Sequence, residues 1–187
     1  MTRTPPFLTG KLLLAMPGIG DPRFERSVIA MCQHDEDGAL GIGIGRIMPR
    51  LGLHALLEQF GIDAPPIADL PIHAGGPVEP QRGFVLHSLD WGGQESIQVS
   101  NRWCLTATID ILRVIGTDKG PRHWLVALGY AGWGPGQLDS EMHRHGWHVA
   151  DASDAILYDT PVEQRWTAAF EAQGIDPRLL AIDSGHT

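Results

Sequence analysis

The stretch GPRHWLVALGYAGWGPGQLDSE, residues 120–141, places a short apolar run beside a dense set of glycines. Residues 124–128 are apolar and predict a buried strand. Glycine adopts positive φ readily and lets two backbones approach closely, at an entropic cost on folding. We therefore expect a loop over residues 129–136, ordered either by packing against the core or by a binding site. Its candidate residues are Gly129, Tyr130, Gly132, Trp133, Gly134 and Gly136.

The segments on either side of this stretch predict a mixed fold. Apolar runs bounded by turn residues predict strands, and Asp37-Gly38 is a strong hairpin signal. Apolar residues at helical spacing predict helices. The expected strands cover residues 11–16, 27–33, 39–45, 83–88, 95–99 and 102–105, and the expected helices cover residues 53–60, 108–115 and 137–145. Because strands and helices do not alternate regularly, an α+β class fits better than a doubly wound sheet.

The last expected helix carries the fullest set of end signals. Thr160 stands at the N-cap position, Pro161 at the first helical position and Glu163 completes a T-x-x-E capping box. Gly174 stands where a helix commonly ends. We therefore expect one helix from Thr160 to Gly174.

Composition narrows the class of protein. A chain of 187 residues, 43% of them hydrophobic, is long enough for one domain with a sizeable core. The net charge of -8 opposes a phosphate backbone, so direct nucleic-acid binding is disfavoured. The cysteines, Cys32 and Cys104, are too few for a disulfide scaffold or a thiolate zinc site. No apolar run approaches the ~20 residues of a membrane span, so we expect a cytoplasmic protein without a membrane association.

Several groups of residues have side chains that could bind a nucleotide or a metal or act in catalysis, but their spacing in the sequence does not fit those functions. Residues 41–45 are glycine-rich, but Arg46 breaks the G-x-G-x-x-G pattern. His87 and Ser88 are adjacent on an expected strand and point to opposite faces, which argues against a hydrolase pair with Asp90. The histidines of residues 143–148 match no common zinc spacing. We therefore assign no catalytic residue, no metal site and no cofactor.

Four blocks of the sequence resemble the YqgE/AlgH family of bacterial proteins. They begin at Gly10 (GKLLLAMPGIGDPRFERSVIAMCQHDEDGALGIGI), Gly75 (GGPVEPQRGFVLHS), Leu105 (LTATIDILRVIGTDKGPRHWLVALGYAGWGPGQLDSE) and Ile156 (ILYDTPVEQRW). The resemblance implies a single α+β domain over residues 1–187. In that domain a largely antiparallel sheet curls into a partly closed, barrel-like shape, with helices packed on it.

The resemblance implies no agreed activity. One branch of the family takes its name from a proposed role in regulating exopolysaccharide production, and the family is labelled a transcriptional regulator without a known DNA-binding motif. This chain also departs from the family pattern at one point. Where the family usually has Asn and a basic residue before proline, residues 45–49 read Gly-Arg-Ile-Met-Pro.

The main hypothesis is a non-enzymatic binding or regulatory protein that affects transcription indirectly, through an unknown protein or small-molecule partner. Its expected site is the glycine loop with Gln137, and with Gly75, Gly76 and Pro77 as neighbours. The alternative is an enzyme acting on a small anionic or phosphate-bearing substrate at the same loop. Asp139, Glu141 and His143 are then the nearest acid–base candidates in the sequence.

Overall fold

The computed structural model describes residues 7–17, 25–93, 95–144 and 146–183. The strands are β1 (Lys11–Ala15), β2 (Val28–Asp35), β3 (Gly38–Gly43), β4 (Ile47–Gly52), β5 (Pro71–Ala74), β6 (Val78–His87), β7 (Ile97–Gln98), β8 (Cys104–Thr106), β9 (Trp124–Trp133) and β10 (Trp147–Asp151). The α-helices are α1 (Leu53–Gln59), α2 (Ile109–Leu112), α3 (Gln137–His143), α4 (Arg165–Ala172) and α5 (Pro177–Asp183). A π-helical turn, η1 (Ala155–Asp159), and a 3-10 turn, η2 (Val162–Gln164), precede α4.

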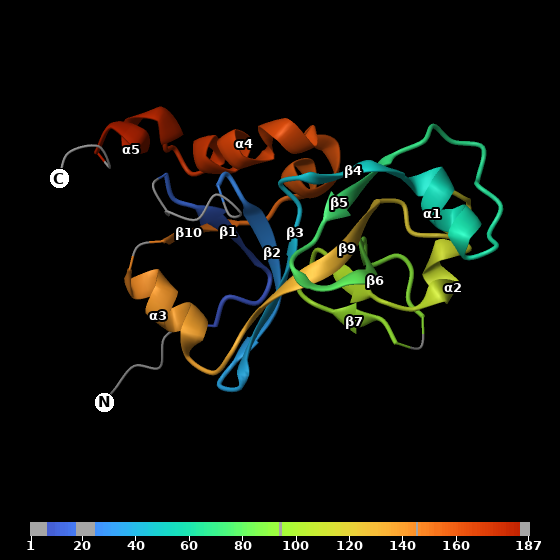
Figure 1. Cartoon of the computed structure of the whole chain (residues 1–187), viewed down its shortest axis with the longest axis horizontal. Coiled ribbons are helices and arrows are strands. Elements are labelled where there is room, and N and C mark those ends of the chain that lie inside the picture. Colours follow the sequence, from blue (N-terminus) through green and yellow to red (C-terminus); the bar gives the residue numbers. More distant parts are fainter. Residues whose placement is uncertain (1–6, 18–24, 94, 145, 184–187) are drawn as a thin grey trace.

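The strands form one curled, largely antiparallel sheet in the order β10-β1-β2-β3-β9-β6-β8-β7. Two strands lie off this path: β4 pairs with β5, and β5 runs parallel to β9. The long strand β9 crosses the molecule and joins the two halves of the sheet (Figure 1). The predicted α+β fold with a curled antiparallel sheet is therefore confirmed.

Both faces of the sheet are buried at β1 and over most of β2, which explains why these strands read as continuous apolar runs. In β1, Leu12 and Leu14 face the main core inside the curl, whereas Leu13 and Ala15 face a second core beside α3. A third core packs α1 and α2 against Val85 and its neighbours in β6 and β9. Helices α4 and α5 lie along the top of the sheet in Figure 1, and Phe170 of α4 is buried in the main core.

Most of the glycine loop expected over residues 129–136 is instead the second half of β9, which ends at Trp133, whereas residues 134–136 form the expected turn. Ala131 pairs with Gly41, Gly132 with Leu40 and Trp133 with Ala39 of β3. This half of the strand still bends, because Gly129 adopts a φ of +77° next to an irregularity in the pairing with β6. For residues 129–133 the loop prediction was wrong because β3 supplies hydrogen-bond partners for a segment whose two glycines are poor strand formers.

The capping box expected at Thr160 is also absent. The Thr160 hydroxyl donates to the carbonyl oxygen of Ala155 at 2.8 Å, which lies behind it in the chain. Pro161 is extended, with φ −53° and ψ 140°, so the chain first makes the 3-10 turn η2. Helix α4 then begins at Arg165 and ends before Gly174, whose φ of +76° matches the expected end of the helix.

Candidate functional site

Residues 75–77 and β9, far apart in the sequence, lie side by side in the structure. The amide of Gly75 donates to the carbonyl oxygen of Leu128 at 2.8 Å, and the amide of Gly43 donates to the carbonyl oxygen of Gly75 at 2.8 Å. These bonds join the ends of β3 and β5 to the bend in β9. Gly75 and the glycine stretch of β9 are therefore in contact, as expected. This contact by itself identifies no binding function.

A cavity of about 220 Å³ opens where these three strands meet, and we call it the glycine cavity. Apolar side chains form most of its walls. It is lined by Ser27, Val28, Ile29, Gly43, Gly45, Arg46, Met48, Ala74, Gly75, Gly76, Pro77, Pro80, Leu128 and Ala131. Three of the predicted site residues, Gly75, Gly76 and Pro77, thus line a cavity.

Glycine is needed in this wall because backbone packs directly on backbone. A Cβ on Gly75 would lie 2.1 Å from the carbonyl oxygen of Gly129, and a Cβ on Gly43 would lie 2.6 Å from that of Ala74. Real Cβ atoms do not approach other atoms this closely. This part of the wall, at Gly43 and Gly75, therefore consists of main chain held by hydrogen bonds, and we expect it to be rigid and preformed.

A second, more polar hollow of about 360 Å³ adjoins the cavity, and we call it the arginine hollow. It shares Gly45 and Arg46 with the glycine cavity. Arg26, Glu25 and Glu163 add charge, and Val162, Trp166 and Thr167 complete the lining. The guanidinium of Arg26 lies 5.3 Å from the centre of the Trp166 ring, a cation–π geometry. The Arg46 guanidinium donates to the carbonyl oxygen of Glu25.

A buried arginine and histidine hold the wall behind the cavity. Arg165 of α4 donates through Nη1 to the carbonyl oxygen of Ile44 at 2.7 Å and through Nε to that of Ile156 at 3.0 Å. The same Nη1 lies 2.6 Å from Nε2 of His73, whose Nδ1 is 3.0 Å from the carbonyl oxygen of Val126. Since Nε2 must accept from Arg165, Nδ1 carries the proton and donates.

These groups have shifted pKa values for the same reason. Burial, reinforced by the positive charge of Arg165, lowers the pKa of His73 to about 4. Burial also lowers the pKa of Arg165 to about 10, which still leaves the guanidinium charged at neutral pH. Residues Ile44 and His73 directly precede Gly45 and Ala74 of the cavity wall. Arg165 and His73 therefore position the wall and do not face the cavity.

The shifted pKa of His73 predicts a pH dependence of stability. In the unfolded chain His73 binds a proton below its ordinary pKa of 6.5, whereas in the folded chain it binds the proton only at about pH 4. The contribution of His73 to stability is therefore fully present above pH 6.5, and up to about 3 kcal/mol of it is lost as the pH falls to 4. Urea unfolding from pH 7 to pH 4 measures this loss.

His73→Asn is the matched variant, because asparagine keeps one donor and one acceptor but does not titrate. Burial also lowers the pKa of His87 and His148, so part of the pH dependence remains in the variant. The slope between pH 6.5 and 4 should still be clearly smaller than in the wild type. Equal slopes would show that His73 is not the buried neutral group described above.

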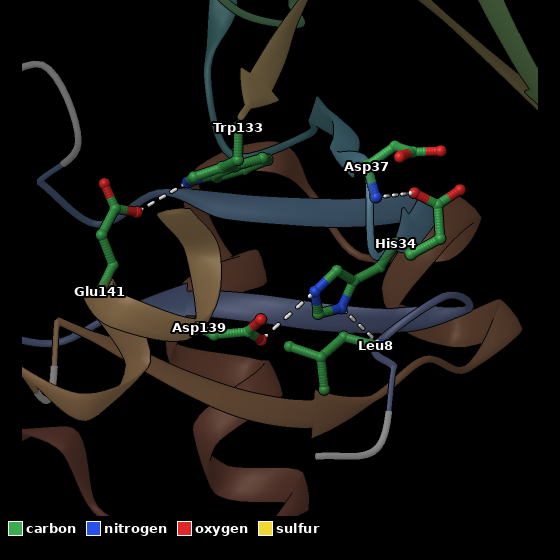
Figure 2. Close-up of polar contacts among 7 residues, drawn as sticks. Leu8, His34, Asp37, Trp133, Asp139 and Glu141 are labelled. Atoms are coloured by element: carbon green, nitrogen blue, oxygen red, sulfur yellow. Dashed lines mark hydrogen bonds and ion pairs between the residues drawn. The ribbon is translucent and has the colours of Figure 1, made fainter. Parts of the chain in front are cut away.

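Trp133 and Tyr130, the aromatic residues of the predicted site, lie in different environments on β9. Trp133 is 8% exposed and packs in the core beside α3. Its indole Nε1 donates to Oε2 of Glu141 at 2.7 Å (Figure 2), and Nε1 of Trp147 donates to the same oxygen at 3.3 Å. Tyr130 is half-buried and meets Phe84 edge-on. Tyr130, Gly132 and Trp133 also line a shallow groove beside Asp35 and Asp37.

Trp133→Phe tests how far this contact stabilises the fold. The variant keeps an aromatic ring but removes the donor to Glu141, so we expect a loss of about 1–2 kcal/mol in the free energy of unfolding. Glu141→Gln retains an acceptor oxygen for Trp133 and should cost less. Chemical denaturation measures both. A neutral Trp133→Phe would mean that the indole N–H does not bond to Glu141 in solution.

Gln137 and Gly134 are bonded to each other in the turn before α3. The side-chain oxygen of Gln137 accepts from the amide of Gly134 at 2.9 Å, and the amide of Gln137 donates to the carbonyl oxygen of Gly134 at 3.1 Å. Gly136 takes a left-handed φ of +70° at the N-cap. These contacts order the turn that leads into α3.

The acid–base candidates of the alternative hypothesis lie on α3, outside the glycine cavity. Oδ1 of Asp139 lies 3.4 Å from Nε2 of the buried His34, whose Nδ1 accepts from the amide of Leu8 at 3.0 Å (Figure 2). Glu141 is bound by the two tryptophans, and His143 is exposed. These contacts join the residues before β1, the strand β2 and helix α3.

The geometry at His87 also argues against a hydrolase pair. The hydroxyl of Ser88 donates to Oδ1 of Asp90 at 2.5 Å, whereas Nε2 of His87 lies 2.7 Å from the hydroxyl of Thr106.

Burial raises the pKa of the Cys32 thiol. His145 lies outside the described residues. Across the described parts of the chain, no three or more His, Cys, Asp or Glu residues lie together as potential metal ligands.

Sequence reasoning missed several residues around the cavity. Arg46 appeared only as the residue that breaks the glycine pattern and in the departure at residues 45–49, and Arg165 appeared only within a family-like block. A charged residue at an otherwise apolar helix face is a signal for a buried arginine, but its partners Ile44 and His73 are distant in the sequence. Their meeting depends on the parallel strand β5, which was not predicted.

A curled antiparallel sheet with covering helices is the architecture of AlgH-like proteins, and comparisons with known proteins agree. The chain matches the AlgH-like family model over residues 12–178 and therefore belongs to this family. It is similar to UPF0301 proteins from Rhizorhabdus wittichii, at 61% identity over 97% of both chains, and from Sphingopyxis alaskensis, at 58% identity over 99% of both.

Solved structures agree with the fold. The solution structure of the AlgH protein from Pseudomonas aeruginosa is similar with a TM-score of 0.78 and 37% identity, covering 100% of both chains. A crystal structure of a Corynebacterium diphtheriae protein, at 20% identity, shares the fold with a TM-score of 0.72 over 97% of this chain and 94% of its own. No specific function is established for the family. Within the described residues, no helix is long and apolar enough to cross a membrane.

Proposed function

We propose that this chain is a non-enzymatic binding protein that holds a small molecule in the glycine cavity and acts as a cytoplasmic regulatory component. The observation that carries the proposal is the cavity itself, a preformed concave space of about 220 Å³ with mostly apolar walls. Ligand sites are typically concave, mostly apolar and supplied with a few polar groups that fix orientation. Arg46 and Ser27 are such groups.

The lining supports binding over catalysis. Among the described residues that line the cavity there is no carboxylate, imidazole or thiol to serve as a general acid, a general base or an activated nucleophile. The hydroxyl of Ser27 has no base among these neighbours. The acid–base candidates of the enzyme hypothesis lie on α3 and are held in other contacts, so no specific observation favours that hypothesis.

The regulatory part of the proposal rests on the family's proposed role and on the charge of the chain. A net charge of -8 disfavours direct contact with nucleic acid, so an effect on transcription would pass through another protein. A bound small molecule stabilises the folded state that binds it. This is a simple physical basis for an interaction with a partner protein whose strength depends on the ligand.

A thermal-shift screen against a metabolite library tests the proposal. A ligand present at a hundred times its Kd stabilises the fold by about 2.7 kcal/mol, which raises the melting temperature by roughly 5–11 °C at this chain length. The same compounds should not shift Ala74→Leu, which fills the cavity, and should still shift Ala68→Leu, an exposed position outside it.

The compound recovered after incubation should be chemically unchanged. Chemical conversion of a hit, with turnover lost in Ala74→Leu, would contradict the non-enzymatic proposal. A hit that shifts Ala74→Leu as much as the wild type would place the site elsewhere.

A further inference from the structure

We infer that the ligand of the glycine cavity is an organic anion, with a compact apolar group in the cavity and an acidic group at Arg46. This inference rests on the proposed function and adds the chemical class of the ligand. It follows from three features: the size of the cavity, the position of Arg46 at its junction with the arginine hollow, and the backbone strain on both sides.

The size of the cavity sets the apolar group. An engineered cavity of about 150 Å³ lined by apolar side chains binds benzene. The glycine cavity, at about 220 Å³, has room for a somewhat larger group, such as a two-ring aromatic or a branched aliphatic group. Met48 lies at its wall, and methionine adapts its shape to a bound group more readily than branched residues do.

The position of Arg46 indicates the charge of the ligand. Among the described residues that line the glycine cavity, Arg46 is the charged one, and it also lines the arginine hollow. A guanidinium is suited to carboxylate and phosphate oxygens, which accept its fixed donors more strongly than neutral oxygens do. An acidic group on a short arm from the apolar group would meet this guanidinium on leaving the cavity.

The acidic residues nearby line only the arginine hollow. Glu25 and Glu163 are among its lining residues and are not among those of the glycine cavity. A charged group at the mouth of the glycine cavity therefore meets Arg46, and Arg26 adds a second positive charge in the hollow. These charges favour an anion over a cation at the junction.

Backbone strain occurs on both sides of the cavity. Two non-glycine residues with positive φ directly adjoin lining residues: Arg26, with φ +56°, precedes Ser27, and Glu79, with φ +45°, precedes Pro80. Such conformations are uncommon outside glycine and cluster at ligand sites, where surrounding structure holds them. Their positions here are consistent with a wall that is shaped for a ligand.

Three probes with one ring system test the inference: indole, indole-3-acetate and tryptamine. They carry no charge, a negative charge and a positive charge on the same bicycle. Isothermal titration with the full-length protein should give indole-3-acetate the tightest binding, about tenfold tighter than indole, because it gains a charge-assisted hydrogen bond. Tryptamine should bind no better than indole.

Three variants and one control assign the effect to the cavity. Arg46→Met should reduce indole-3-acetate to the affinity of indole, while Arg113→Met, an exposed arginine outside both spaces, should leave the preference unchanged. Ala74→Leu should weaken all three probes, and Ser27→Val, a smaller change in the same wall, should weaken them too. Thermal unfolding of each variant checks that it is folded.

The outcomes separate this inference from the proposed function. If indole binds and Ala74→Leu abolishes its binding, but the three probes have equal affinities, the cavity binds small molecules and the anionic class is wrong. A preference for tryptamine, or a preference for indole-3-acetate that survives Arg46→Met, would also overturn the inference. If no probe binds and the metabolite screen gives no shift, both proposals fail.

Discussion

Gly75→Ala should destabilise the protein by at least about 3 kcal/mol, or prevent it from folding. Gly75 has no positive φ, so alanine brings no conformational strain of its own. Its Cβ would instead lie 2.1 Å from the carbonyl oxygen of Gly129 and 3.0 Å from that of Leu128. Both contacts are with backbone, which cannot rotate away. Relief therefore requires β5 to separate from β9, with loss of the bond from Gly75 to Leu128.

Two glycines provide matched controls for this substitution. Gly92 has open space around it and no positive φ, so Gly92→Ala should be neutral or slightly stabilising. Gly136 also has open space but a φ of +70°, so Gly136→Ala should cost only the strain of a left-handed alanine, about 1–2 kcal/mol. Urea unfolding measures all three. A cost for Gly75→Ala no larger than that of Gly136→Ala would contradict the backbone-to-backbone contact.

Arg165→Met should cost about 3–5 kcal/mol of unfolding free energy. Methionine fills similar space but donates no hydrogen bond. Three buried acceptors would then lack the donors that Arg165 supplies. They are the carbonyl oxygens of Ile44 and Ile156 and the Nε2 atom of His73. Each buried acceptor left without a donor costs about 1–3 kcal/mol, partly offset because a buried charge is also removed.

Arg178→Met is the control for this prediction. Arg178 pairs with Asp176 at 2.8 Å, but its side chain is 88% exposed, so the variant should change stability by less than about 0.5 kcal/mol. Arg165→Lys is informative as well, because lysine keeps a charge but cannot match the directions of the guanidinium donors. We expect it to remain strongly destabilised. An Arg165→Met variant as stable as the wild type would show that α4 does not depend on these bonds.

Much of the fold was readable from local pattern. The apolar runs of β1 and β2, the Asp37-Gly38 hairpin and the spacing of α1 depend on neighbours in the sequence, and each lies close to its predicted position. Two local signals were overridden by distant contacts. The glycines after residue 128 became strand because β3 pairs with them, and the Thr160 hydroxyl turned back to Ala155 instead of capping a helix.

The sequence by itself determined the elements with strong periodicity, the apolar faces of the sheet and the supply of glycine at residues 43, 75 and 129. It did so because these properties depend on side-chain type and on short spacing. Only the tertiary structure decided that the three glycine segments meet around one cavity, and that Arg165 reaches His73 across 92 residues. The physical reason is that close backbone packing and buried hydrogen bonds depend on which strands become neighbours. In this fold the decisive pairing is that of β5 with β9.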